Sequence, residues 1–268
     1  GAPRIMAMLE EWLQCEWPGL RVLLDDQTTQ WANFTIAGPR AREGLSALGT
    51  DIDLSAASLP HLAAAQGSVA GLAARVVRVS FSGELSFEVN VPSGSGPALL
   101  EAILEAGAAQ AITPYGIESL MVLRAEKGYL HVGTDTDGSS TPDDVGWGHV
   151  ARGKSGDFIG KRSLARPANL DRGRKQLVGL EPLEGQQPIR PGGHLLIGAG
   201  RQPPGLTDGW VTSACYSPTL DRYIALGVLR GGDERLGEVV TVCDEDRRIS
   251  VKVVARMFYD PSNSRLEN

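Results

Sequence analysis

Residues 75–91 read RVVRVSFSGELSFEVNV, and in this stretch apolar and polar side chains alternate on both sides of a central Ser-Gly-Glu. Alternation with a period of two is typical of a strand that buries one face, and Gly83 between the two runs favours a β-hairpin. Glu88 falls inside the second run. A carboxylate on such a strand either faces solvent or is satisfied by hydrogen-bond donors, and periodicity cannot choose between these.

The sequence on either side of the hairpin mixes helices with strands and shows no regular βαβ repeat, which favours an α+β fold over a doubly wound one. Helical spacing and helix-ending residues predict helices near residues 8–13, 42–48, 98–106 and 117–125. Short apolar runs predict strands at 20–24 and 31–37.

The pattern of expected elements changes from mixed helices and strands to strands alone after a charged stretch at 166–175 that contains Pro167 and Gly173. Such a stretch is typical of a domain boundary, so we predict one domain over 1–168 and another over 169–268. Beyond it, six short strand candidates separated by Gly, Pro and Asp clusters predict a small all-β barrel or sandwich; they are residues 176–180, 194–197, 209–214, 223–229, 238–243 and 249–255.

Composition excludes several classes of function. The 268 residues include 42% hydrophobic and 22% charged residues, and no apolar run approaches the roughly 18 residues of a membrane-spanning helix. A formal net charge of −6 disfavours nucleic acid as a partner. Cys15, Cys215 and Cys243 are too widely spaced to indicate a disulfide framework or a metal site. The first residues lack a secretory pattern, so we expect a cytoplasmic protein.

Residues 123–129 read LRAEKGY, with charges alternating at an expected helix end. Taken alone, this pattern predicts surface ion pairs and a helix C-cap. The stretch Asp135-Thr136-Asp137-Gly138 resembles the start of a calcium loop, but it lacks the closing glutamate and indicates a polar turn.

Four segments in order resemble the glycine-cleavage T-protein family: VSFSGELSFEV at 79–89, LRAEKGY at 123–129, TPDDVG at 141–146 and DFIGKR at 157–162. The residues of the FSGEL and RAEKGY segments resemble the alpha subunit of heterotetrameric sarcosine oxidase more than a free-standing T-protein. The resemblance covers essentially the whole chain. It implies a T-protein-like folate-binding α/β domain, N-terminally truncated, followed by the family's small all-β barrel.

The resemblance also implies a function. The family binds tetrahydrofolate and passes a one-carbon unit to it; in sarcosine oxidase an imine made at a flavin on another subunit leaves as 5,10-methylenetetrahydrofolate. The implied cofactor is therefore tetrahydrofolate, with flavin and NAD on regions outside this chain or on the beta, gamma and delta partner subunits. The expected substrate is sarcosine, with dimethylglycine or another N-methyl amine as alternatives.

By motif matching, Glu88 corresponds to the family's pterin-binding glutamate. Tyr115, Arg124, Glu126 and Tyr129 are carried over as residues of the pocket wall or of the structure. No catalytic residue is assigned, because the resemblance implies that the family's Asp-Asp section has no counterpart here, and the isolated chain is expected to be catalytically incomplete. The spacing of the cysteines indicates no metal ligand. Leu120 stands where T-proteins have an arginine. The alternative hypothesis is an inactive T-protein-like scaffold with an interaction or regulatory role.

Overall fold

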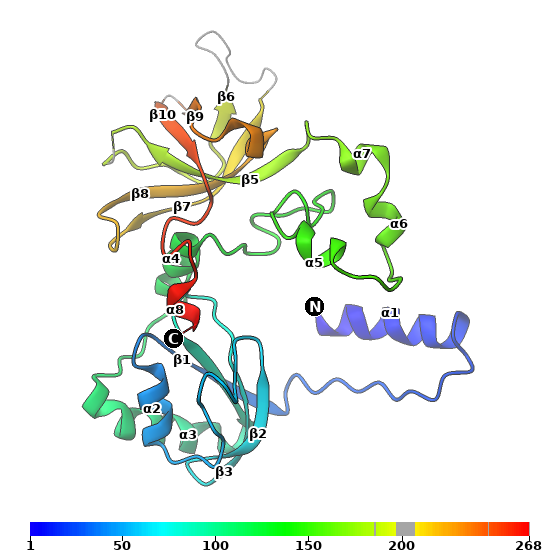
Figure 1. Cartoon of the computed structure of the whole chain (residues 1–268), viewed down its shortest axis with the longest axis vertical. Helices are drawn as coiled ribbons and strands as arrows, with labels where there is room; N and C mark the ends of the chain where they lie inside the picture. The colour runs from blue at the N-terminus through cyan, green and yellow to red at the C-terminus, as the bar shows by residue number, and fades with distance from the viewer. Residues whose placement is uncertain (185, 197–206, 246, 268) are drawn as a thin grey trace. The chain divides into compact units, whose positions relative to one another are not determined.

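The computed structural model describes residues 1–184, 186–196, 207–245 and 247–267. Its contacts divide the chain into two units: unit 1 comprises Gly1–Ser80, Glu84–Pro114 and Leu266–Asn268, and unit 2 comprises Phe81–Gly83 and Tyr115–Arg265. The predicted combination of an α+β portion and a β-barrel is confirmed (Figure 1). The boundary at 168/169 stays a prediction; the contacts themselves group residues 115–168 with the barrel.

Unit 1 holds a small sheet with helices. Its elements are α1 (Ala2–Cys15), β1 (Trp31–Ala37), α2 (Ala41–Ala47), β2 (Ala64–Val69), β3 (Leu72–Val77), β4 (Ser86–Pro92), η1 (Ser93–Ser95), α3 (Gly96–Ala106) and η2 (Gly107–Gln110). The strands form an antiparallel sheet in the order β1-β4-β3-β2.

The predicted hairpin is confirmed as the β3–β4 pair, in which Val77 lies opposite Glu88. Its first strand ends at Val77, earlier than the alternation suggests. The next residue, Arg78, is 2% exposed and donates to the carbonyl oxygens of Leu59 at 3.0 Å and Leu266 at 2.6 Å. The strand predicted at 20–24 is wrong, because this segment has no ladder partner.

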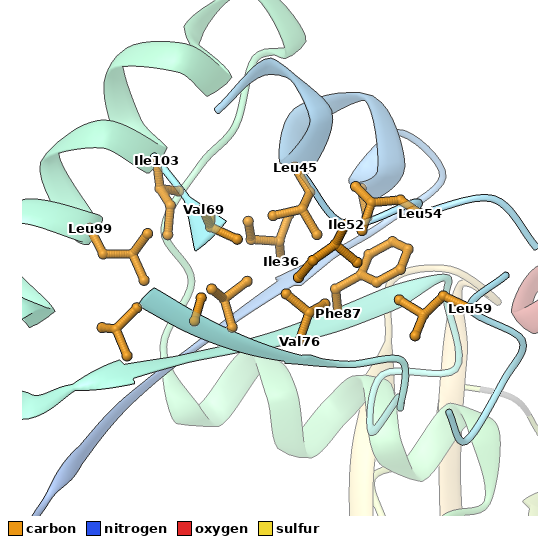
Figure 2. Packing of buried hydrophobic residues seen from close by; sticks show 14 of the residues in the cluster. Ile36, Leu45, Ile52, Leu54, Leu59, Val69, Val76, Phe87, Leu99 and Ile103 are labelled. Atoms are coloured by element: carbon orange, nitrogen blue, oxygen red, sulfur yellow. The ribbon is translucent and has the colours of Figure 1, made fainter. Parts of the chain in front are cut away.

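The core of unit 1 lies on one face of the sheet (Figure 2). Phe87 and Val89 of β4 are fully buried, and α2 and α3 pack on the same face through Leu45, Leu99 and Ile103. Because side chains alternate along each strand, the remaining outward positions all fall on the opposite face.

Unit 2 begins with helices and irregular segments and ends in a barrel. Its elements are α4 (Ile117–Lys127), α5 (Gly148–Arg152), α6 (Lys161–Leu164), α7 (Pro167–Leu170), β5 (Lys175–Pro182), β6 (His194–Leu196), β7 (Gly209–Ser217), β8 (Arg222–Arg230), η3 (Gly232–Arg235), β9 (Val239–Asp244), β10 (Arg247–Val254) and α8 (Ser264–Glu267), the last of which runs into unit 1.

Six strands close the barrel in the order β10-β5-β8-β7-β6-β9, and each corresponds to a strand predicted from the sequence. Of the alternatives barrel and sandwich, the structure has the barrel. Its interior is filled by aliphatic side chains, among them Leu180, Leu195 and Val251, all with no exposed surface. Residue 197, the last of the second predicted strand, lies outside the described residues. No described helix combines the length and apolarity needed to cross a bilayer.

Candidate functional site

Unit 1 carries a group of polar side chains on the face of its sheet that points away from α2 and α3. We call this group the polar sheet face; it consists of Trp31, Asn33, Thr35, Gln66, Arg75, Ser86, Glu88 and Asn90. The members come from four strands, but the register places them in adjacent rows. Asn33, Asn90, Arg75 and Gln66 form one row across the sheet, and Thr35 lies beside Glu88 in the next.

Glu88 is half-buried at the centre of this face, between Thr35 on β1 and Val77 on β3. The Asn33 side-chain amide donates to Glu88 Oε2 at 3.4 Å and to Asn90 Oδ1 at 2.9 Å. Among the described residues no donor reaches Glu88 Oε1 within hydrogen-bond distance. The carboxylate is therefore held through Oε2, and Oε1 can still accept hydrogen bonds.

Ser86 lies two residues before Glu88 on β4 and thus on the same face of the strand. It is 2% exposed, and within the described part of the chain its Oγ has no hydrogen-bond partner. Buried polar groups are nearly always paired, so this covered hydroxyl is an exception among the side chains of the polar sheet face.

Arg75 contributes a positive charge to the same face. Its guanidinium carbon lies 4.6 Å from the centroid of the Trp31 ring, within the range of a cation–π contact. Arg75 pairs with Asn90 and Trp31 pairs with Pro92, so the side chain of Arg75 reaches across β4 to make this contact. Among the described residues, no ion pair between Arg75 and a carboxylate is found.

The LRAEKGY segment forms the end of α4 in unit 2, and the prediction that its charges lie on the surface is wrong. Arg124 is 3% exposed and its Nη1 lies 2.6 Å from Asp135 Oδ2, while its Nη2 donates to Ser213 Oγ at 2.6 Å. Glu126 is 2% exposed and accepts hydrogen bonds from Ser217 Oγ at 2.6 Å and Thr219 Oγ1 at 3.1 Å. The barrel strand β7 and the turn after it thus supply partners for both charges.

The predicted C-cap is confirmed, because Gly128 adopts φ +72° directly after Lys127. Two motifs that are distant in the sequence meet here. A side chain at Gly83 would come within 2.8 Å of Lys127, and Phe81 stacks on Tyr129 with ring centroids 6.3 Å apart. Burial, and to a lesser degree the nearby Asp260 carboxylate, raise the pKa of Tyr129.

The five residues predicted from the sequence therefore divide between the units. Glu88 belongs to unit 1, whereas the other four belong to unit 2. Arg124, Glu126 and Tyr129 gather at the end of α4; Tyr115 precedes the start of that helix, remains 42% exposed, and has a pKa raised by partial burial. Beside them, burial and the Glu126 carboxylate raise the pKa of the Cys215 thiol to about 11, so this cysteine is no nucleophile at neutral pH.

Unit 2 also contains a cavity of about 470 Å³ that the sequence did not indicate. Polar groups of the turn at 133–140 and the charged stretch at 171–175 line it, together with Trp210. Arg174 bonds Asp144 at 2.6 Å, and Lys175 Nζ lies 4.7 Å from the Trp210 ring centroid. These charges are thus largely engaged by groups of the wall itself. Within the described ranges, no group of three or more His, Cys, Asp or Glu side chains could hold a metal ion.

Comparison with known proteins agrees with this architecture. The family model described as "GCVT N-terminal domain" matches residues 1–154, and "Glycine cleavage T-protein C-terminal barrel domain" matches residues 175–260. The chain belongs to the glycine cleavage T-protein family. The resemblance inferred from the four ordered motifs is thereby confirmed.

Among named relatives, this T-protein family member is 39% identical over 99% of its length to "Sarcosine oxidase subunit alpha" of Corynebacterium sp. (strain U-96), and 40% identical to the protein of the same name from Rhizobium meliloti (strain 1021). It spans only 28% and 27% of those proteins. It is 34% identical to the "Aminomethyltransferase" of Symbiobacterium thermophilum, covering 93% of this chain and 65% of that one.

The fold of this family member is shared with a solved aminomethyltransferase. The glycine cleavage system aminomethyltransferase T from Bartonella henselae superposes with a TM-score of 0.75 at 23% identity, covering 97% of this chain and 66% of that one.

Proposed function

We propose that the polar sheet face binds the pterin ring of tetrahydrofolate through Glu88, and that the chain is the folate-binding portion of a sarcosine oxidase-like enzyme. The observation that supports this is the half-buried Glu88 carboxylate, held at Oε2 by Asn33 while Oε1 remains open. The polar edge of a pterin presents a ring N–H beside an amino group. A carboxylate accepts two parallel hydrogen bonds from such a pair, and charge-assisted bonds of this kind are stronger than neutral ones.

The rest of the face suits the same ligand. Asn33 and Asn90 bond to each other, so their amides are held in place before a ligand arrives. A preorganised site loses less entropy on binding than one whose side chains must first be ordered.

In the whole enzyme, the proposed reaction transfers the one-carbon unit released from an oxidised N-methyl amine to tetrahydrofolate, giving 5,10-methylenetetrahydrofolate. Sarcosine is the substrate we favour, because the sarcosine oxidase alpha subunits match nearly the full length of this chain. The flavin-bearing partner subunits would oxidise the amine, in a cytoplasmic assembly. This chain's own contribution is to hold the acceptor.

A second hypothesis is a scaffold that no longer performs one-carbon chemistry. One observation favours it: both terminal nitrogens of Arg124 and the Glu126 carboxylate, from the most charged family motif, are bonded by groups of unit 2 itself. Such a scaffold would show no specific response to folate.

Thermal unfolding with and without saturating tetrahydrofolate tests the proposal. A ligand that binds only the native state raises the melting temperature, so the wild-type chain should be stabilised. Glu88→Ala should lose the shift, because a charge-assisted contact is worth about 1.5–3 kcal/mol. Glu101→Ala is the matched control, since Glu101 is an exposed glutamate of α3 in the same unit. Equal stabilisation of wild type and Glu88→Ala contradicts the Glu88 assignment; absence of any shift in wild type favours the scaffold.

A further inference from the structure

We propose that Arg75, oriented by Trp31, binds a carboxylate of the glutamate tail of folate, so that the polar sheet face holds its ligand at two points. This inference rests on the proposed function, because it takes the pterin ring to lie on Glu88. It adds a second binding residue and predicts that the site distinguishes a complete folate from a bare pterin.

The first argument is position along the sheet. Glu88 and Arg75 are on neighbouring strands, and Arg75 lies opposite Asn90, two residues further along β4 than Glu88. Two residues of a strand correspond to ~7 Å, and the four residues from Glu88 to Pro92, the partner of Trp31, to ~13 Å. Folate is an elongated molecule in which a benzoyl ring separates the pterin from the glutamate. A ligand that starts at Glu88 and runs along β4 therefore passes Asn90 and arrives at Arg75 and Trp31.

The second argument is charge. Arg75 is the cation of the polar sheet face, and among the described residues no carboxylate forms an ion pair with it. A guanidinium presents a planar fork of donors that matches both oxygens of a carboxylate. The tail of folate carries carboxylates, whereas its pterin end does not. The charges on the face, negative at Glu88 and positive at Arg75, thus match the two ends of the ligand in one orientation.

The third argument is preorganisation. The guanidinium stacks on Trp31 at 4.6 Å, which restricts a side chain that otherwise has many rotamers. The Asn90 side chain also donates to the carbonyl oxygen of Arg75 at 3.4 Å, which links the arginine to the Asn33–Glu88 hydrogen bonds. Both anchors therefore lie in adjacent rows of the sheet that the Asn33 and Asn90 side chains connect.

The test compares two ligands, tetrahydrofolate and 6-methyltetrahydropterin, which has the pterin but no tail. Dissociation constants are measured by titration calorimetry, or by NMR where binding is weak, for the wild-type chain, Arg75→Met and Glu88→Ala. Arg40→Met is the matched control, because it removes one positive charge at the start of α2, away from the polar sheet face. Thermal unfolding without ligand verifies that each variant remains folded.

We expect Arg75→Met to weaken tetrahydrofolate binding roughly five- to twentyfold and to leave 6-methyltetrahydropterin unaffected, while Glu88→Ala weakens both and Arg40→Met neither. Equal effects of Arg75→Met on both ligands, or none on tetrahydrofolate, overturn the inference while folate binding stands. A wild-type chain that binds neither ligand overturns the proposed function together with this inference.

Discussion

The Lys127 ammonium lies 2.6 Å from the carbonyl oxygen of Asp260 and 3.0 Å from its Oδ2, and the Lys127 side chain has no exposed surface. The contact joins the end of α4 to the segment that follows the barrel's last strand. It is reinforced by the Glu126 carbonyl oxygen, which accepts from the backbone amides of Phe258 at 3.0 Å and Tyr259 at 2.9 Å. The family motif at 123–129 therefore bonds the beginning of unit 2 to the segment that follows β10.

Replacement of Lys127 by Met should lower the free energy of unfolding by about 3 kcal/mol, because removal of one partner leaves a buried carboxylate uncompensated. Urea denaturation followed by circular dichroism measures the change. Lys252→Met is the matched control: Lys252 is an exposed residue of β10, and its loss should alter stability by less than about 0.5 kcal/mol. Equal losses in the two variants would show that the buried pair contributes nothing specific.

Asp260 should make the stability of the protein sensitive to acid. Burial opposes ionisation of its carboxyl group, but hydrogen bonds from Ser264, Lys127 and the Arg265 amide outweigh this and hold its pKa well below the ordinary value. A depressed folded-state pKa stabilises the native state above the unfolded-state pKa of about 3.9, and this stabilisation is lost as the pH falls toward the folded pKa. Melting temperatures between pH 6 and pH 2.5 should therefore fall more steeply for wild type than for Asp260→Asn. Parallel curves would argue against this linkage.

The barrel was predictable because its signals are local. Each of its strands alternates or runs apolar for three to nine residues and has Gly, Pro or Asp nearby, so the strand positions follow from short windows of sequence. The apolar run at 20–24 looks similar but forms no ladder, and Leu23 is 99% exposed. Whether a run becomes a strand depends on a partner, and a short window contains no information about partners.

The candidate site was only partly predictable for the same reason. Glu88 was identified through resemblance, while Asn33 and Arg75, which share its face, lie 55 and 13 residues away in sequence and carry no motif. The charges of LRAEKGY were expected at the surface, yet Ser213, Ser217 and Asp260, 89 to 133 residues distant, supply their partners. Burial of a charge is decided by such distant partners rather than by neighbouring residues.

Gly128→Ala should destabilise the protein by more than about 1 kcal/mol. The residue has φ +72°, which costs a non-glycine residue roughly 1 kcal/mol, and a Cβ there would collide with the carbonyl oxygen of Arg256. Gly133→Ala carries the first effect alone, since Gly133 has φ +91° but no atom within 4 Å of such a Cβ, so the difference between the two variants reports the contact with Arg256. Thermal or urea unfolding should rank Gly128→Ala as clearly less stable than Gly133→Ala. The reverse order would show that the backbone at Arg256 can move away from the new methyl group without lowering the free energy of unfolding.

Asn33 should act as a positioning residue for Glu88 in folate binding. Asn33→Ala removes the amide that donates to Glu88 Oε2 at 3.4 Å, and we expect a loss of roughly three- to tenfold in tetrahydrofolate affinity, in line with one partly exposed hydrogen bond. Asn33→Asp should be worse, because a second carboxylate beside Glu88 disfavours ionisation of both groups, and its affinity should decline further between pH 7 and pH 5. Titration calorimetry at both pH values measures this, with Gln14→Ala as control, an exposed amide of α1 outside the polar sheet face. A purely structural role for Asn33 predicts equal losses in the two variants at both pH values, since the charge of the replacement would then have no bearing on Glu88.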